Sequence, residues 1–135
     1  MSGQRKSLWT ENIKVRWGDM DALGHVNNTE YFRYMEQTRI SWFNAFAIPM
    51  LENGCGPVVV RATCDFIKPI TYPATVSVAT YLEKVGRSSF TVTHDIRLDT
   101  DAAVQFATGE VVVVWIDHAL GKSMPLPARV LQALG

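Results

Sequence analysis

The stretch that decides the fold runs from Trp17 to Tyr31 and reads WGDMDALGHVNNTEY. It places two aspartates, a glycine, a histidine and two asparagines between an alternating segment, residues 9–17, and residues 28–48, which contain no glycine or proline. The alternation is typical of a half-buried strand, and the long uninterrupted segment is typical of a helix. We therefore expect this polar stretch to connect the end of a strand to the start of the one long helix.

The start of the predicted helix carries a capping pattern. Asn27 is a good N-cap, and Glu30 is spaced to reach back to the cap amide, as in a capping box. The amides of the first three helical residues would then lack intrahelical acceptors and could stabilise a developing oxyanion. Asp21 precedes this helix start by a few residues, and the flexible Gly24 lies between them. A carboxylate beside free amides suits acyl-transfer chemistry.

The string GDMDALGHVNNTEYFRYMEQTR resembles the signature of hot-dog-fold thioesterases of the 4-hydroxybenzoyl-CoA thioesterase type. It is most similar to the acyl-CoA thioester hydrolase branch, in which D-x-D-x-x-G-H-V-N-N-x-x-Y is followed by a long helix. The resemblance implies that Asp21 is the catalytic carboxylate and that the backbone amide of Asn28 is the oxyanion donor. Plant-type acyl-carrier-protein thioesterases share H-V-N-N but have an asparagine where this chain has Leu23, so a catalytic role for His25 stays open.

Other polar residues of the motif have simpler interpretations. Asp19 is expected to be structural, bonding loop amides, and Gly24 and Asn27 are candidates for substrate binding beside their roles in the turn and the cap. Asp19, Asp21 and His25 offer too few ligands for a hard cation and no close His or Cys cluster for zinc, so no metal is expected. The resemblance likewise implies no cofactor.

The rest of the chain predicts a helix followed by antiparallel strands. The helix has a broad apolar face, as expected for a helix wrapped by a sheet, and Glu36 is spaced to pair with Arg39. His94 lies in an apolar alternation and is expected to be a core or helix-facing histidine. The predicted later elements are strands over residues 57–68, 75–85, 88–98 and 103–116 and a short helix over 128–134. This order gives an α+β fold, and the resemblance makes it a hot-dog fold, an antiparallel sheet wrapped around one long central helix.

Length and composition set further limits. At 135 residues the chain is expected to be one domain, residues 1–135, with residues 1–7 as a loose tail. Thirteen basic and thirteen acidic residues cancel, which argues against nucleic-acid binding. No apolar run has the length of a membrane span or of a secretory signal, so no membrane partner is expected. Cys55 and Cys64 lack metal spacing, which favours reduced thiols and a cytoplasmic location.

The resemblance implies hydrolysis of an acyl-CoA thioester to a free carboxylic acid and coenzyme A. The alternatives are a hot-dog module that only binds acyl-CoA or an acyl carrier, and a hot-dog dehydratase, which would need a His–acid pair. Exposed sheet edges predict a homodimer or homotetramer with active sites at the subunit boundary. Arg87 and Ser88, in a predicted hairpin turn, are candidates for binding the coenzyme A end of the substrate.

Overall fold

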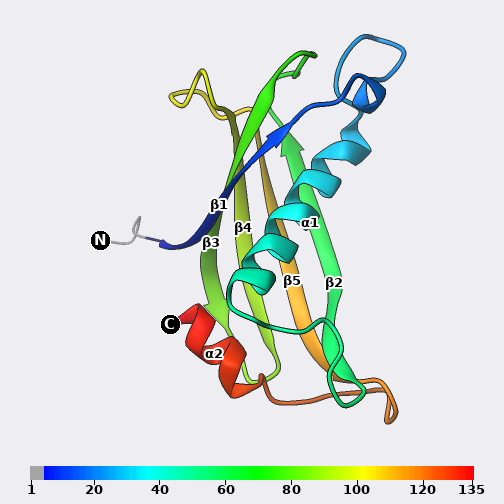
Figure 1. Ribbon diagram of the computed structural model, residues 1–135, viewed down its shortest axis with the longest axis vertical. Coiled ribbons are helices and arrows are strands. Elements are labelled where there is room, and N and C mark those ends of the chain that lie inside the picture. The colour runs from blue at the N-terminus through cyan, green and yellow to red at the C-terminus, as the bar shows by residue number, and fades with distance from the viewer. Residues whose placement is uncertain (1–4) are drawn as a thin grey trace.

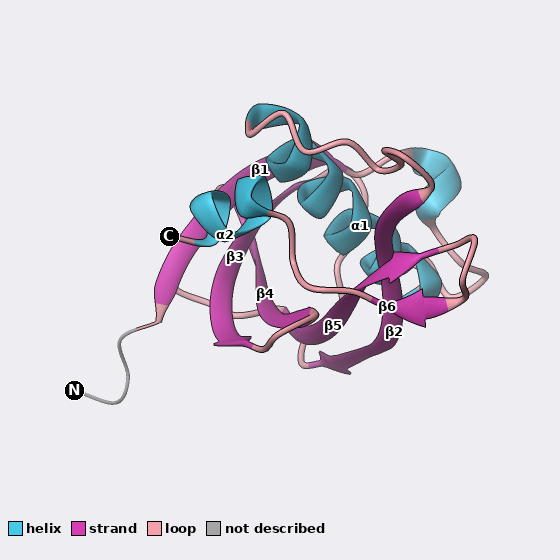
Figure 2. Ribbon diagram, turned by 90° about the horizontal axis from the view of Figure 1, so that it is seen from below, coloured by secondary structure: helices cyan, strands magenta, loops and turns pink. Residues whose placement is uncertain are grey.

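The computed structural model of the chain describes residues 5–135. Within them a curved antiparallel sheet wraps around one long helix, as Figures 1 and 2 show from two directions. The elements follow in the order β1 (Lys6–Lys14), a short helical turn (Trp17–Asp19), α1 (Asn28–Ala45), β2 (Cys55–Phe66), β3 (Thr75–Val85), β4 (Ser89–Leu98), β5 (Ala107–Asp117), β6 (Lys122–Ser123) and α2 (Ala128–Leu134). The predicted α+β hot-dog architecture is confirmed.

The sheet has the strand order β1-β3-β4-β5-β2, and every neighbouring pair is antiparallel. The short β6 pairs with the end of β5, at Ile116 and Asp117, beyond the residues that pair with β4. The edge strands β1 and β2 run in the same direction, so both end at the end of the sheet where α1 begins (Figure 1). The segments that follow these two strands therefore meet beside the N-terminus of α1.

Helix α1 begins as predicted, because Asn27 has extended backbone angles and its side chain accepts a hydrogen bond from the Thr29 amide. The helix ends at Ala45, three residues before the predicted end at Ile48, and the chain then turns through Ala47 at a φ of 55°. Its buried side chains face the sheet; they are Tyr31, Tyr34, Met35, Thr38, Trp42 and Phe43. Met35 packs directly on Gly109 of β5, where a Cβ atom would collide with the methionine sulfur. The absent side chain lets the helix approach the sheet closely.

The core is divided along the helix into two hydrophobic clusters. One surrounds Trp42 and includes Phe90 and residues of α2, and the other surrounds Met35 and includes Ile96 and Val76. Each fully buried side chain of this kind contributes about 1.5–3 kcal/mol relative to an exposed one. The two clusters therefore hold α1 against the sheet at both its ends, which fixes the position of its N-terminus.

Three local expectations are wrong. Trp17 does not continue the first strand but lies in the helical turn, with a relative exposure of 77%. The tail expected over residues 1–7 already pairs as strand β1 at Lys6 and Ser7, opposite Leu82 and Tyr81; residues 1–4 lie outside the described residues.

The third concerns strand β2, whose predicted unbroken alternation does not hold. Val59 pairs with Val113 and Arg61 with Val112, so Val60 is an extra residue, a β-bulge. Because the extra residue reverses the alternation, Val58 and Ala62 point to opposite faces instead of sharing one. The bulge thus turns Val59 and Ala62, on either side of it, toward the helix.

No helix of the described chain combines the length and the apolar character that crossing a membrane would require.

Candidate active site

The loop between β1 and α1 is closed on itself like a small hairpin. Met20 and Val26 form an isolated antiparallel bridge, and the Asp21 amide donates to the His25 carbonyl at 2.7 Å. Gly24 has a φ of +77°, a backbone conformation that glycine adopts at little cost, and its amide donates to the Asp21 carbonyl at 3.1 Å. Gly24 therefore makes the turn that holds Asp21 in place.

Only one of the two oxygens of the Asp21 carboxylate accepts hydrogen bonds from the described residues. Its Oδ1 accepts hydrogen bonds from the backbone amides of Leu23, at 2.9 Å, and His25, at 3.3 Å. Such bonds from local amides fix the rotation of the side chain. Within residues 5–135, no donor lies within hydrogen-bond distance of Oδ2. One oxygen thus orients the carboxylate, and the other is free to meet a water molecule or a substrate.

The first turn of α1 leaves a single amide free. The Thr29 amide donates to Asn27 Oδ1 at 3.0 Å and the Glu30 amide to the Asn27 carbonyl at 2.9 Å. The Glu30 side chain does not cap the Asn27 amide, which donates to the Asp19 carbonyl at 2.9 Å instead, so the predicted capping box is wrong in its second half. The Asn28 amide has no acceptor among the described residues. This is the amide that the sequence motif singled out as the oxyanion donor.

Asp21 and Asn28 line the same cleft, which has a volume of about 290 Å³. Its wall also includes His25, Tyr31 near the start of α1, and residues 66–69, at the end of β2 and just after it. The His25 ring makes no hydrogen bond or ion pair within the described part of the chain, so it is available to a ligand. The structure therefore brings together the three residues that the motif nominated for catalysis, a carboxylate, an imidazole and a free helix amide.

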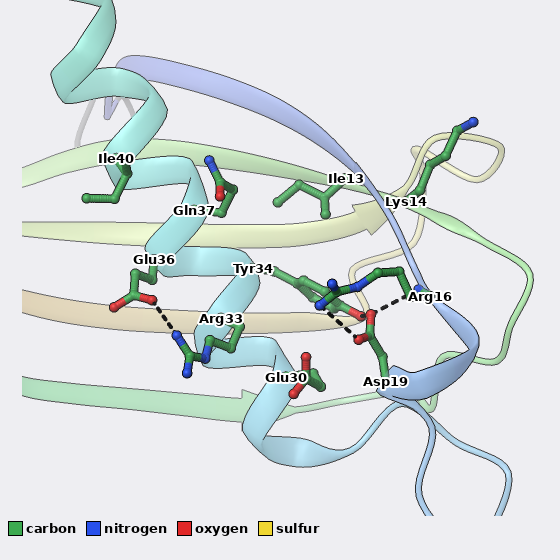
Figure 3. A pocket seen from close by; sticks show the side chains of 10 residues that line it. All are labelled: Ile13, Lys14, Arg16, Asp19, Glu30, Arg33, Tyr34, Glu36, Gln37 and Ile40. Atoms are coloured by element: carbon green, nitrogen blue, oxygen red, sulfur yellow. Dashed lines mark hydrogen bonds and ion pairs between the residues drawn. The ribbon is translucent and has the colours of Figure 1, made fainter.

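Asp19 has a different environment, shown in Figure 3. It lies with 4% exposure at the end of a groove of about 610 Å³ between β1 and α1. Its Oδ2 accepts from the Arg16 amide at 3.0 Å and from the Tyr34 hydroxyl at 2.8 Å, and Oδ1 lies 3.4 Å from the Arg16 guanidinium. Asp19 therefore ties the end of β1 to α1, as the structural interpretation of this residue expected.

These contacts determine the charge of Asp19. Burial alone would raise the pKa of its carboxyl, but the hydrogen bonds from the Arg16 amide and the Tyr34 hydroxyl, with the Arg16 charge, hold this pKa below its ordinary value. The pKa of the neighbouring Glu30 is raised by burial and by the negative charge of Asp19. The negative charge of Asp19 is thus fixed behind the loop.

Arg87 and Ser88, the candidates for binding coenzyme A, do not line the cleft of Asp21 and Asn28. Arg87 and Ser88 form the turn between β3 and β4, where the Arg87 carbonyl accepts from Leu126 and the Ser88 carbonyl from Trp115. Thr75, at the other end of β3, pairs with Lys14 close to the loop that contains Asp21, and eleven strand residues span roughly 35 Å. One chain therefore does not bring Arg87 or Ser88 to Asp21.

Lys68 is a basic residue of the cleft that the sequence argument did not favour. It lies in the segment after β2 and lines the cleft with Asp21 and Asn28. The sequence indicated only that Lys68 adjoins a turn; its proximity to Asp21 depends on the pairing of β2 at the sheet edge, which no local pattern reveals. The described residues contain no group of three or more His, Cys, Asp or Glu side chains placed to hold a metal ion.

Comparisons with known proteins identify the family of the chain. The profile of the Thioesterase-like superfamily matches residues 15–134. An Aquifex aeolicus protein provisionally described as an esterase is 31% identical over 124 residues, which cover 90% of this chain and 93% of that protein.

Two solved structures are similar in both sequence and fold. PA2801 of Pseudomonas aeruginosa, provisionally described as a thioesterase, is 38% identical with a TM-score of 0.91, covering 96% of this chain and 100% of that one. A Xanthomonas campestris protein provisionally described as an acyl-CoA thioesterase is also 38% identical, with a TM-score of 0.76 and coverage of 83% and 95%. The chain therefore belongs to the Thioesterase-like superfamily.

Proposed function

We propose that the protein hydrolyses acyl-CoA thioesters, with Asp21 as the catalytic carboxylate and the Asn28 amide as the oxyanion donor. The observation that supports this most directly is that a carboxylate oxygen and a helix amide, both without partners among residues 5–135, line one cleft. The acyl-CoA substrate class is that of the similar Xanthomonas campestris protein. Thioesters need no metal to be cleaved, because the thiolate is a good leaving group.

In the proposed reaction the thioester oxygen lies at the Asn28 amide. Asp21 either removes a proton from water as the water oxygen attacks the carbonyl carbon, or attacks that carbon itself to form an anhydride that water then cleaves. The carbonyl π electrons move to the oxygen, where the amide stabilises the negative charge, and their return breaks the carbon–sulfur bond. Coenzyme A leaves as the thiolate and takes up a proton. His25 is placed to orient the water or the substrate.

The two alternative functions, a dehydratase and a module that only binds acyl-CoA, would require a different site. A dehydratase requires a committed His–acid pair, and the His25 ring contacts no acid in the part of the chain that the structure describes. A module that only binds acyl-CoA has no use for an oriented carboxylate with a free oxygen. The homodimer and the cytoplasmic location remain predictions. Both cysteines are free thiols, which is consistent with a reducing compartment.

The test is release of free thiol from acyl-CoAs that vary in chain length and ring content, measured for the wild type and for Asp21→Asn. The substitution keeps the size of the side chain and its bonds to the loop amides but removes the base and the nucleophile. We expect kcat to fall by at least ~10²-fold with little change in KM.

Asp19→Asn serves as the matched control. It changes the other aspartate of the motif, whose carboxylate is buried and fully engaged, so it should lower the melting temperature more than it lowers kcat. A fully active Asp21→Asn protein would refute the assignment of Asp21, and one that is inactive because it has unfolded would leave the assignment without support.

A further inference from the structure

A layer of polar side chains crosses the core between the two hydrophobic clusters. Thr38 of α1, Thr80 of β3 and His94 of β4 are all fully buried. His94 Nδ1 lies 2.9 Å from the Thr80 hydroxyl, and Nε2 lies 3.2 Å from the Arg39 guanidinium. Because arginine can only donate, Nε2 must be the acceptor, so Nδ1 carries the proton and donates to Thr80. The histidine is therefore neutral and does not compensate the positive charge of Arg39.

Among the residues that the structure describes, Arg39 consequently has no counter-ion. It is partly buried on α1, and burial lowers the pKa of its guanidinium, while the nearby charge of Glu36 opposes this shift. The predicted Glu36–Arg39 pair is wrong, because Glu36 pairs with Arg33 at 3.2 Å. No ion pair within residues 5–135 includes Arg39. A partly desolvated charge without a counter-ion is costly, so an anionic ligand or partner at this position would be favoured.

The Arg39 side chain lines a cleft of about 370 Å³ between α1 and the strands β2 and β5. The strand side of this cleft is apolar and consists of Val59, Ala62 and Val111. On the helix side, Arg33 and Glu36 neutralise each other, which leaves Arg39 as the net charge. The cleft therefore combines an apolar wall with one unmatched guanidinium.

This Arg39 cleft is the neighbour, along α1, of the proposed catalytic cleft that Asp21 and Asn28 line, although the two share no lining residue. The catalytic cleft includes Asn28 and Phe66, and the Arg39 cleft begins with Thr29 and Phe32. Phe32 and Phe66 meet edge to face, with ring centroids 6.5 Å apart, at the junction of the two. The two rings form the boundary between the clefts, so a ligand whose thioester lies at Asn28 would have to pass Phe32 to bring the far end of its acyl group to Arg39.

We propose that Arg39 selects acyl groups that carry a carboxylate at their far end, so that the preferred substrates are ω-carboxyacyl-CoA thioesters. This inference rests on the proposed thioesterase function and specifies its substrate class. A carboxylate is the group that a guanidinium fork binds best, with two parallel hydrogen bonds. The apolar wall would accommodate the methylene chain between the two ends.

The distance between Asn28 and Arg39 along the helix sets the length of acyl chain that fits between them. Asn28 and Arg39 are eleven residues apart, which corresponds to about 16 Å along the helix axis. Because helical side chains lean toward the N-terminus, the guanidinium lies roughly 10 Å from the amide, a gap that an extended acyl chain of about eight carbons spans.

The experiment compares suberyl-CoA with octanoyl-CoA, which have the same number of acyl carbons and differ only in a terminal carboxylate or methyl group. We expect the wild type to have a kcat/KM at least ~10-fold higher for suberyl-CoA, and Arg39→Met to remove this preference by lowering the suberyl-CoA value alone. Arg33→Met is the matched control, because it removes a cation of the same cleft that already has a carboxylate partner, and it should leave the ratio unchanged. Melting curves and light scattering verify that each variant folds and assembles as the wild type does.

The outcomes separate this inference from the proposed function. Absence of thiol release from every acyl-CoA would contradict the hydrolase, and calorimetric titration of Asp21→Asn protein with the same two thioesters would still show whether the carboxylate is preferred. Equal kcat/KM values for the two thioesters, or a higher value for 4-hydroxybenzoyl-CoA than for suberyl-CoA, would overturn the inference. So would an Arg39→Met protein that dissociates into monomers with an unchanged ratio, since Arg39 would then pair with a carboxylate of a second copy.

Discussion

At the scale of single residues, the two aspartates of the motif differ because their surroundings differ. Asp19 and Asp21 are two positions apart, yet the first is 4% exposed with both oxygens engaged and the second has an oxygen open to the cleft. Asp19 ends the helical turn and Asp21 follows the extended Met20, and the two aspartates line different cavities, the groove beside β1 and the cleft that includes residues 66–69. Structural and catalytic roles are thus assigned by burial and hydrogen bonding, not by residue type.

His94 supports a prediction about pH at this same scale. Burial, with the Arg39 charge beside it, lowers the pKa of His94 from 6.5 to about 3. Between these two values the unfolded chain binds a proton that the folded chain does not, so stability must fall as the pH falls from 6.5 toward 3. The free energy of unfolding falls by up to about 1.4 kcal/mol per pH unit over this range. Denaturant titrations at several pH values above 4.5 would measure it.

The matched variant for this measurement is His94→Gln, which keeps a polar side chain but cannot titrate. Its stability should change less with pH over the same range, whatever its absolute value. The range above pH 4.5 is chosen because Asp19 has an ordinary pKa of 3.8, lowered further by its contacts, and so adds its own acid-induced loss only at lower pH. Equal slopes for the wild type and the variant would show that His94 does not titrate in the expected way.

At the scale of elements, α1 and its N-cap could be predicted because local chemistry determines them. The absence of glycine and proline over residues 28–45 and the Asn27 cap are visible in the sequence. The missing second half of the capping box could not be predicted, because it depends on Asp19, which accepts the Asn27 amide in place of the Glu30 side chain. The bulge at Val60 was missed for a similar reason, since it is defined only by pairing with β5, about fifty residues later.

The single free amide of α1 can be removed without changing the helix. Asn28 is the first helical residue, where proline is favoured, and Asn27 has the extended conformation that a residue before proline adopts. Asn28→Pro therefore deletes the proposed oxyanion donor and should lower kcat by ~10²–10³-fold while the melting temperature stays near that of the wild type.

Asn28→Ala is the control for this substitution, because it keeps the backbone N–H and removes only the side chain. We expect it to retain most of the wild-type kcat. If Asn28→Pro folds normally and is as active as Asn28→Ala, the amide is not the oxyanion donor. Circular dichroism and steady-state kinetics on the two variants are sufficient for this comparison.

At the scale of the whole molecule, the free edge of β2 favours assembly. β2 pairs with β5 on one side, and the described residues provide no strand for its other side. Val59, Val60 and Phe66 on this strand are large apolar residues with relative exposures of 43%, 56% and 47%. Exposed apolar residues on an unpaired edge are a common basis for pairing with a second copy.

We predict a homodimer formed through this edge. Val60→Glu should convert it to a 15.1 kDa monomer in light scattering, because a charge on an edge strand opposes pairing. Val85→Glu, at an apolar position of similar exposure (44%) on the interior strand β3, should leave the assembly unchanged. A wild type that is monomeric at micromolar concentration would contradict the prediction.

Such a dimer would also explain how Arg87 could act on a substrate bound at Asp21. Arg87→Ala is expected to raise the KM for acyl-CoA and to weaken its dependence on salt, because the coenzyme A phosphates need a cation. Since β3 separates the two residues within one chain, we predict that Arg87 serves the Asp21 of the partner subunit.

Mixed dimers test this arrangement directly. Co-expression of Asp21→Asn chains with Arg87→Ala chains creates dimers in which one site combines the intact Asp21 of one chain with the intact Arg87 of the other. If Arg87 acts across the interface, these dimers recover a component of activity with the KM of the wild type, although neither variant has it alone. If Arg87 acts within its own chain, every active site of the mixture lacks it, and only the raised KM is observed. That second result would contradict the arrangement across the interface. A KM that Arg87→Ala leaves unchanged at low ionic strength would remove Arg87 from the coenzyme A site.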